Sequence, residues 1–335
     1  MEIVTHPYEK AFIEWSKDKP DVLVLSADLT YSCEVGKWKE IYPDRFFSMG
    51  LAEQNMMGFA AGLARRGFYP FLHTFAVFLY RRPYDQLAMS IAYPNLPVRL
   101  VGFLPGITTP GGVTHQATDD IAILRTTPNM TILDCGDATD VETVLDVAQL
   151  IEGPVYIRML RGEVPRLFNK NEKMVFNHAR ALSWGSDLVI FSEGICTEEV
   201  LRVTPLVKEK GLSITHLHVS TLKPFSDPQI IKAISKARFG VISIENHNII
   251  GGLGSAIAEI IAEKGLAKRL IRLGLKDTYA HGASQSYLMK EYQIDGMSLV
   301  KAIESLINKK LDIFEKDLGK LSLEPAHSLL KVEDL

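Results

Sequence analysis

The sequence predicts an α/β protein built as two three-layer α/β domains, each with a mostly parallel sheet between helices. Short apolar runs rich in Val, Ile and Leu alternate with helical patterns, and continuous apolar strands of this kind are buried on both faces. The alternation stops once, over residues 163–184, and then resumes. The chain of 335 residues is long enough for two domains with full cores.

The first domain is expected over residues 1–162. Its apolar runs predict strands at 21–28, 45–50, 69–75, 98–103, 130–136 and 153–160. A helix is expected over residues 137–151, and helix-forming sequence also follows the earlier strands. Parallel strands need such crossover helices, so this pattern favours a parallel sheet covered on both faces.

Residues 163–184 are polar, include Pro165 and show no sustained period, so we interpret them as a linker. A second α/β domain is expected over residues 185–311. Its predicted strands lie at 187–193, 213–219, 239–245 and 268–275, and its helices begin at Thr197, Asp227 and Gly252. The tail, residues 312–335, is charged and weakly amphipathic.

Composition narrows the function. The net charge of −3 argues against nucleic acid or an anionic membrane as the main partner. No apolar run is long enough to span a bilayer, and the first residues lack a signal-peptide pattern. The cysteines Cys33, Cys135 and Cys196 are scattered and odd in number, which disfavours a disulfide framework and a zinc cluster. We therefore expect a reducing, cytoplasmic location.

Glu53 stands at the start of a segment, residues 50–64, that reads as a helix apolar on every side and therefore buried. Two explanations are open at this point. The carboxylate can stabilise the first turn through the helix dipole. Alternatively, because a buried carboxylate is costly without a specific partner, it can serve a ligand that carries a basic ring nitrogen.

Two further stretches can likewise be explained by a structural role or by a ligand site. Phe75, Phe78 and Arg81 recur at a spacing of three residues, which is typical of core packing and also suits a wall of a ligand site. A glycine-rich loop at residues 110–120 carries His115 to the entrance of a helix, where a histidine is commonly a cap. Neither pattern decides between a structural and a functional role.

Taken together, the motifs resemble the transketolase family. They are "SADLT" (26–30), "GLAEQNMMGFAAGLA" (50–64), "TFAVF" (74–78), "THQATDDIAILRTTPNM" (114–130) and "IENHNIIGGLGSAIAE" (245–259). Their order and spacing over residues 5–306 are similar to a transketolase pyrimidine-binding domain followed by the C-terminal domain.

The family's diphosphate-binding domain has no counterpart here. The only partial match to its Gly-Asp-Gly signature is "GDA" at residues 136–138, which lacks the second glycine. The resemblance therefore implies one subunit of a split enzyme, with no metal of its own. Thiamine diphosphate would be shared with a partner subunit that holds the diphosphate and a Mg²⁺ or Ca²⁺ ion, and we expect two copies of each chain.

The resemblance also implies roles for residues. The glutamate at the Glu53 position hydrogen-bonds N1′ of the aminopyrimidine, which promotes removal of the thiazolium C2 proton. Phe75 and Phe78 match aromatics around that ring, and Asp28 matches an acid near the cofactor. Arg81 stands where the family usually has a tyrosine of the cofactor site.

At the substrate, His115 matches a histidine that binds hydroxyls and moves protons, so Glu53 and His115 are the expected catalytic pair. Ser32 and Arg161 match residues that bind the substrate phosphate. Two positions depart from the family: Phe103 replaces a histidine and Gly111 replaces an aspartate that reads a donor hydroxyl. We therefore expect an altered ketose, such as a sulfonated, unphosphorylated or branched sugar.

The second domain offers two further motifs whose function has to be judged. They are Glu245 and His247, in "IENH", and the glycines at 251–254. The glycine spacing does not fit a dinucleotide fingerprint, so we take these glycines as aids to tight helix packing. The resemblance implies that the C-terminal domain contributes mainly to dimer contacts, and we expect the Glu245–His247 pair at a subunit interface.

Three functions are open from the sequence. The first is a transketolase subunit that transfers a two-carbon ketol unit from a ketose to an aldose acceptor. The second is the β subunit of a 2-oxoacid dehydrogenase or a deoxyxylulose phosphate synthase-like enzyme. The run at residues 110–130 favours transketolase or deoxyxylulose phosphate synthase over the dehydrogenase β subunit. The third is a non-catalytic regulatory partner subunit.

Overall fold

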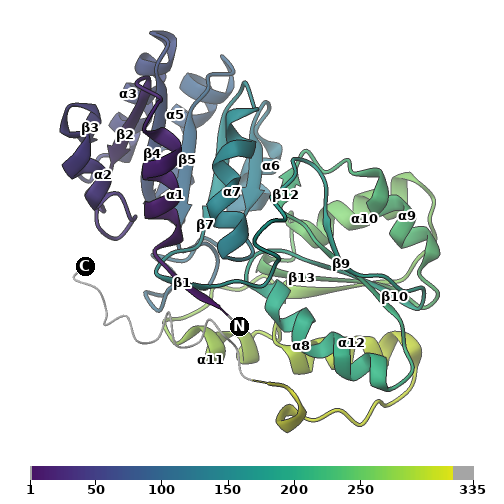
Figure 1. Ribbon diagram of the computed structural model, residues 1–335. Coiled ribbons are helices and arrows are strands. Elements are labelled where there is room, and N and C mark those ends of the chain that lie inside the picture. The colour runs from purple at the N-terminus through teal and green to yellow at the C-terminus, as the bar shows by residue number, and fades with distance from the viewer. Residues whose placement is uncertain (1, 320–335) are drawn as a thin grey trace.

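The computed structural model describes residues 2–319 and contains two three-layer α/β domains, as predicted. Figure 1 shows the first domain at upper left and the second at lower right, with their sheets running in different directions. The first sheet has seven strands and the second has five. A separate two-stranded ribbon lies near the junction.

The first sheet has the strand order β12-β6-β7-β5-β4-β2-β3. Its first-domain strands are parallel to one another: β2 (Val22–Ser26), β3 (Phe46–Ser48), β4 (Tyr69–Phe75), β5 (Arg99–Phe103), β6 (Thr131–Asp134) and β7 (Val155–Met159). Each lies within a segment expected to be a strand. Their side chains are almost all buried on both faces, which explains why they read as continuous apolar runs.

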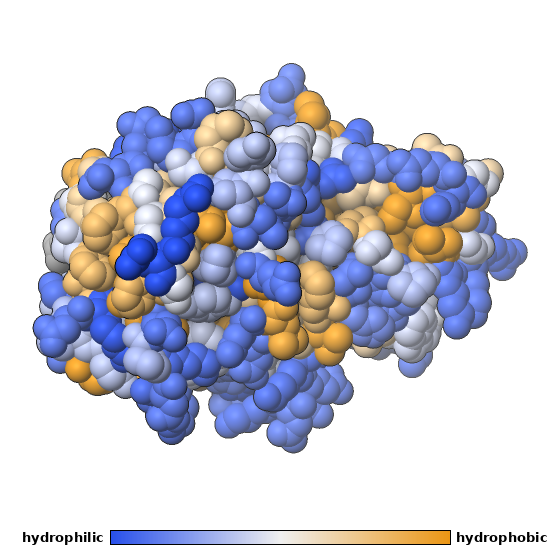
Figure 2. Space-filling view, turned by 90° about the horizontal axis from the view of Figure 1, so that it is seen from above, coloured by the Kyte–Doolittle hydropathy of each residue, from blue (hydrophilic) through white to orange (hydrophobic). Residues whose placement is uncertain are grey.

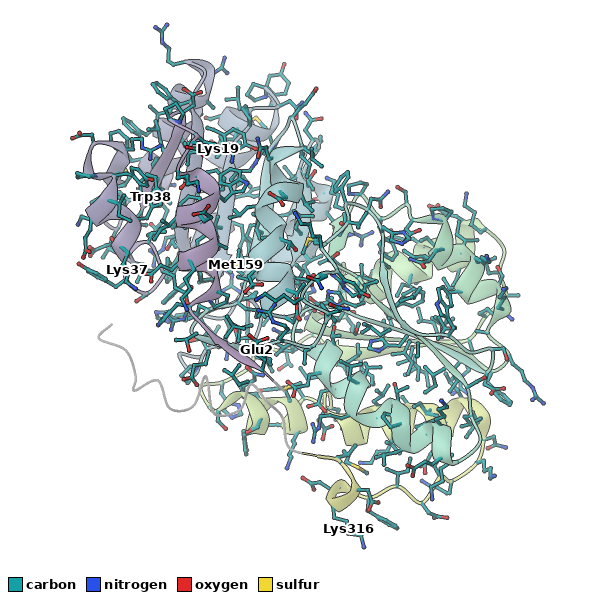
Figure 3. All side chains as sticks on the ribbon, in the orientation of Figure 1. Glu2, Lys19, Lys37, Trp38, Met159 and Lys316 are labelled. Carbon is teal, nitrogen blue, oxygen red and sulfur yellow. The ribbon has the colours of Figure 1, made fainter. Side chains whose placement is uncertain are left out.

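Helices cover both faces of this sheet (Figure 1). One face carries α1 (Pro7–Ser16), α2 (Gly36–Ile41), the 3₁₀ turn η1 (Pro43–Arg45) and α7 (Ala138–Gln149). The other carries α3 (Glu53–Arg65), α4 (Ala76–Tyr80), α5 (Tyr84–Gln86), the π-helix η2 (Leu87–Ala92) and α6 (Asp120–Thr126). Lys37 of α2, labelled in Figure 3, is exposed and donates to Glu9 Oε1 of α1 at 2.7 Å, while its neighbour Trp38 is fully buried.

The second sheet has the order β14-β13-β10-β11-β9. Its strands are β9 (Arg180–Ser183), β10 (Leu188–Ser192), β11 (Ile214–His218), β13 (Gly240–Asn248) and β14 (Leu270–Leu275), and only β9 is antiparallel to its neighbour. Its helices are α8 (Cys196–Glu209), α9 (Pro228–Lys236), α10 (Leu253–Glu263), α11 (Gln285–Glu291) and α12 (Gly296–Ile307), with a 3₁₀ turn η3 (Glu315–Asp317). Figure 1 shows α9 and α10 on one face and α8 and α12 on the other.

The expected linker forms strands, and one strand of the second domain's sequence joins the first sheet, which the sequence did not indicate. The expected linker contains β8 (Glu163–Pro165), paired antiparallel with β1 (Ile3–Thr5), and also β9, the edge of the second sheet. Conversely, β12 (Thr221–Lys223) comes from the second domain's sequence and pairs with β6 in the first sheet. Edge strands of three or four residues are too short to show a period, so the segment read as featureless.

The helix α3 is not buried on every side, contrary to the sequence reading. One stripe faces the core, including Glu53, Met56 and Met57, while the opposite side is exposed. A Cβ added at Gly58 or Gly62 would meet nothing within 4 Å. Small residues on this helix therefore leave an open face instead of packing within the chain.

Among residues 2–319, no helix is long and apolar enough to cross a bilayer. The face seen in Figure 2 is mostly hydrophilic, with apolar side chains gathered in several smaller areas. Of the expected tail, residues 320–335 lie outside the described part of the chain.

A fully buried arginine, Arg158 of β7, joins the two domains. Its Nε donates to Asp120 Oδ2 at 2.9 Å, and its Nη1 donates to Asp134 Oδ2 at 2.9 Å. From the second domain it meets Glu193 Oε2 at 2.7 Å through Nη1 and the Asn246 carbonyl oxygen at 3.0 Å through Nη2. Burial raises the pKa of Asp134 to about 6 in spite of the arginine.

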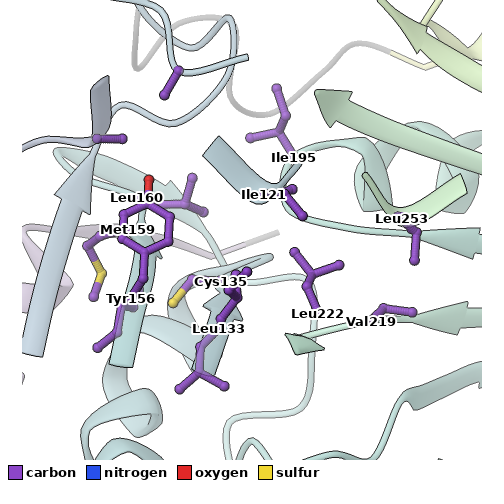
Figure 4. Packing of buried hydrophobic residues seen from close by; sticks show 14 of the residues in the cluster. Ile121, Leu133, Cys135, Tyr156, Met159, Leu160, Ile195, Val219, Leu222 and Leu253 are labelled. Atoms are coloured by element: carbon purple, nitrogen blue, oxygen red, sulfur yellow. The ribbon is translucent and has the colours of Figure 1, made fainter. Parts of the chain in front are cut away.

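Apolar side chains from both domains pack around this junction (Figure 4). Those labelled there include Leu133, Cys135, Tyr156, Val219, Leu222 and Leu253. Met159, labelled in Figure 3, is the last residue of β7 and follows Arg158 directly. The end of β7 is thus fixed by polar contacts and by apolar packing at once.

Glu245 and His247 are fully buried inside the chain, so the expectation that they form a subunit contact is wrong. Glu245 accepts a hydrogen bond from the Gly254 amide at 3.0 Å, and a Cβ at Gly252 would come within 2.0 Å of its Oε2. The glycines here do serve close packing, as expected. Burial raises the pKa of Glu245 to about 8.

Replacing Arg158 by methionine should strongly destabilise the chain, because three buried carboxylates would lose their shared cation. Removing one partner of a buried ion pair typically costs about 3–5 kcal/mol in the free energy of unfolding. Chemical denaturation of the wild type and the variant measures this loss in the free energy of unfolding. The control is Lys173→Met, whose ion pair with Asp146 is exposed on both sides and whose loss should cost about 1 kcal/mol or less. Equal losses in the two variants would contradict this account.

The contribution of Glu245 to stability should fall as the pH rises from about 5 to about 8, because the folded chain holds a proton on Glu245 that the unfolded chain releases. The folded pKa is raised, so the contribution is complete below the unfolded pKa and is lost as pH rises through the folded one. Glu245→Gln should flatten this slope in pH-dependent thermal melts. An unchanged slope would show that Glu245 is ionised in the folded chain.

Candidate active site

Several predicted site residues lie at one edge of the first sheet. Asp28 and Ser32 follow β2, Phe75 ends β4 and Arg161 follows β7. Parallel strands finish at the same edge, and ligands of open α/β sheets bind outside the carboxyl ends of the strands. The topology therefore gathers residues that are far apart in the sequence.

Three rings form a cluster at this edge. Phe75 and Phe78 are stacked, with ring centroids 6.1 Å apart and an interplanar angle of 22°. His115 meets both edge-on, at 6.3 Å from Phe75 and 5.5 Å from Phe78. Thr114 Oγ1 lies 2.8 Å from His115 Nδ1 and steadies the imidazole. The structure thus brings together the aromatics and the histidine that the sequence proposed separately.

Glu53 is the first residue of α3 and is only 3% exposed. It lines a hollow of about 620 Å³ together with residues 51–55 and Arg82. Its Oε1 accepts a hydrogen bond from Arg82 Nη1 at 2.8 Å. A nearly buried carboxylate at the wall of an open hollow is positioned to meet a ligand, and its helix position also suits the dipole.

Arg82 is the site residue that the sequence analysis missed. Besides its ion pair with Glu53, its Cζ lies 4.5 Å from the centroid of the Phe78 ring. The sequence signal for this residue was the Arg81–Arg82 pair, which follows Phe75 and Phe78. Both arginines follow the end of α4 at Tyr80, where the chain turns, and no local period there says which of the two faces the site.

Arg81, the predicted member of the cofactor site, points to a different partner. Its Nη2 donates to Asp119 Oδ1 at 2.7 Å and its Nη1 to the Val113 carbonyl at 3.1 Å. These contacts tie the loop that carries His115 to the end of α4. Within this chain, Arg81 supports the loop, and Arg82 is the arginine that pairs with Glu53.

The Arg161 side chain forms the other side of the ring cluster. It is mostly buried, its Cζ lies 5.6 Å from the centroid of Phe75, and its Nη1 donates to the Ser32 carbonyl at 2.8 Å. Ser32 and Arg161, predicted together from the resemblance, are therefore neighbours in space. A half-buried serine beside a guanidinium forms a polar corner suited to an anion.

Other predicted residues are placed differently. Phe103 is fully buried and packs against Tyr8 with ring centroids 5.4 Å apart, so its side chain belongs to the core. Asp28 is exposed, with a left-handed backbone at φ 62°, just beyond β2. A Cβ at Gly111 would come within 3.0 Å of the His115 Cβ, so a side chain there would press on the histidine.

The second domain braces the His115 loop. The Asn246 Oδ1 accepts from the Ile107 amide at 2.9 Å, and a Cβ at Gly112 would meet the Gly282 amide nitrogen at 3.2 Å. Gln116 Nε2 donates to the His281 carbonyl at 3.3 Å. The catalytic candidate on the first domain is thus held partly by the second.

Comparison with known proteins matches both domains. The transketolase pyrimidine-binding domain family matches residues 4–166, and the transketolase C-terminal domain family matches residues 177–298. A putative transketolase C-terminal section from Methanocaldococcus jannaschii is 37% identical over 306 residues, which cover 90% of this chain and 96% of that protein. A subunit of the 6-deoxy-6-sulfo-D-fructose transketolase of Clostridium sp. (strain MSTE9) is 33% identical and covers 90% and 94%.

A solved structure described as a split gene transketolase, inactive beta4 tetramer, superposes with a TM-score of 0.82. It is 33% identical in sequence, and the alignment covers 91% of this chain and 98% of that one. These similarities run through both domains and include relatives of nearly the same length. The chain therefore belongs to the transketolase family, of which it carries the pyrimidine-binding domain and the C-terminal domain.

Proposed function

We propose that the chain is one subunit of a split transketolase that uses thiamine diphosphate to move a two-carbon ketol unit from a ketose to an aldose acceptor. The observation that carries this proposal is the position of Glu53, a nearly buried carboxylate that lines an open hollow near stacked aromatic rings. The similarity to subunits of split transketolases gives the reaction type.

The residues present fit the aminopyrimidine end of this cofactor. Glu53 would hold a proton shared with the ring nitrogen N1′, and Phe75 and Phe78 would exclude water from the ring. Asp28 lies at the same sheet edge, where it would contact the cofactor as the resemblance implies. When bound, thiamine diphosphate supplies the carbon nucleophile that carries the two-carbon unit. His115 would hydrogen-bond substrate hydroxyls and transfer their protons.

The substrate should be a ketose with an anionic or otherwise altered distal end. Arg161 and Ser32 form the polar corner that would bind the anion. Gly111 removes one polar contact of the family, and the fully buried Phe103 removes another. A sulfonated sugar fits this set, in keeping with the sulfosugar enzyme subunit among the relatives.

The partner would be a chain that carries the diphosphate-binding domain and its Mg²⁺ or Ca²⁺ ion. Among residues 2–319, no group of three or more His, Cys, Asp or Glu side chains is arranged to hold a metal. The open face of α3, defined by Leu51, Gly58, Phe59 and Gly62, supports assembly with a partner or a second copy, and we expect two copies of each chain. The three scattered cysteines, all buried, suit a reducing cytoplasm.

Glu53→Gln should abolish most of the activity of the assembled complex while leaving its assembly intact. Glutamine keeps the size of the side chain but cannot hold the shared proton, so kcat should fall by about 10²–10⁴. The melting temperature should change little, because Arg82 is 54% exposed and can be rehydrated.

The measurements are ketol transfer and the exchange of the cofactor C2 proton, followed by NMR after quenching. Both rates should slow in parallel. If both stay within a few-fold of wild type, Glu53 serves only the helix dipole. If the wild-type complex binds thiamine diphosphate but converts no ketose, the regulatory-subunit function is correct instead.

Gly62→Gln should separate folding from assembly. The position is helical with open space around it, so replacing glycine should stabilise the isolated chain by about 0.5–1 kcal/mol. The added side chain should weaken assembly about tenfold or more, equal to about 1.4 kcal/mol. Thermal melts and sedimentation measure the two effects, with Lys10→Gln on the exposed side of α1 as control. Unchanged assembly would exclude this face of α3 as an interface.

A further inference from the structure

Arg82 makes the two contacts that a planar nitrogen heterocycle would need at Glu53. Its Nη1 lies 2.8 Å from Glu53 Oε1, and its Cζ lies 4.5 Å from the centroid of Phe78. We propose that the Arg82 guanidinium is an internal stand-in for the aminopyrimidine ring. It neutralises Glu53 while the site is empty and must withdraw before the cofactor ring can bind. This inference rests on the proposed function.

The chemistry of the two groups explains the exclusion. A guanidinium is planar, donates N–H groups to a carboxylate in a fixed geometry and stacks on aromatic faces. An aminopyrimidine is also planar and offers a ring nitrogen beside an amino group. Both groups would approach the Glu53 carboxylate, where Arg82 already occupies Oε1, and both would stack on the Phe78 ring. Arg82 in this position and a bound aminopyrimidine would therefore compete for the same space.

The burial of the two partners makes the contact reversible. Glu53 is 3% exposed, so its carboxylate would be costly without a partner. The Arg82 side chain is 54% exposed, so its charge returns to water easily when it is displaced. Its backbone is held in place by Gln54, whose Nε2 donates to the Arg82 carbonyl at 3.3 Å. Only the side chain has to move.

The neighbouring arginine cannot play this part. Arg81 is held by Asp119 and by the Val113 carbonyl, and its guanidinium faces the His115 loop. Arg82 therefore acts as a competitor within the chain: the apparent affinity for the cofactor is lowered by the fraction of molecules in which Glu53 is already paired. It also protects the empty subunit from carrying a bare carboxylate.

Arg82→Ala tests the inference with two measurements that do not depend on turnover. In the complex with the partner subunit, titration calorimetry should show thiamine diphosphate binding several-fold tighter than in wild type. In the chain alone, the melting temperature should fall, because Glu53 loses its counter-ion. Adding Glu53→Gln to Arg82→Ala should restore most of that melting temperature. The control is Arg65→Ala, an exposed arginine at the far end of α3.

Each outcome decides the inference. Unchanged or weaker cofactor binding in Arg82→Ala overturns it, since Arg82 would then be neutral or a cofactor ligand. An equal gain in Arg65→Ala also overturns it, because the effect would be one of net charge. If the wild-type complex binds no thiamine diphosphate, the proposed function fails. The melting temperatures of the isolated variants still show in that case whether Arg82 stabilises Glu53.

Discussion

The buried guanidinium of Arg158 is the interaction on which the arrangement of the two domains depends. It satisfies carboxylates from both domains and a carbonyl oxygen of β13, at the end of β7. Arg161 of the candidate site follows three residues later. Asp120, one of the partners, begins α6 directly after the loop that carries His115. The contacts of Arg158 therefore help to set the position of the polar corner, formed by Ser32 and Arg161, relative to His115.

This junction holds more negative than positive charge. Arg158 faces Asp120, Asp134 and Glu193, with Glu245 nearby in the second domain, and all are buried. One cation cannot neutralise them all, and the raised pKa of Asp134, to about 6, follows from burial in that setting. An apolar junction of the same volume would cost less desolvation free energy to bury. The polar contacts instead hold the two sheet edges in a defined orientation, and Asn246 extends that control to the loop at Ile107.

The candidate site is built as one wall of a larger site. Glu53 and Arg82 line an open hollow, and the exposed side of α3 continues beyond them with small and apolar residues. The aromatic cluster lies beside this hollow through the contact of Phe78 with Arg82. Within the described chain, Arg82 closes part of this wall by pairing with Glu53. In the proposed function, a second chain that covered the hollow would exclude water and complete the contacts to a cofactor, so that assembly and activity would depend on the same residues.

The sequence by itself determined most of the local elements and the family, and it supplied most of the candidate residues of the site. Strands buried on both faces are readable because burial on both faces requires an unbroken apolar run, and the motif around Glu53 is long enough to identify the family. Tertiary structure decided the rest: the edge pairings of β9 and β12, the burial of Phe103 and Glu245, and the choice of Arg82 over Arg81 as partner of Glu53. Those outcomes depend on contacts between residues distant in the chain and on how the chain turns after α4, and the local period of the sequence predicts neither.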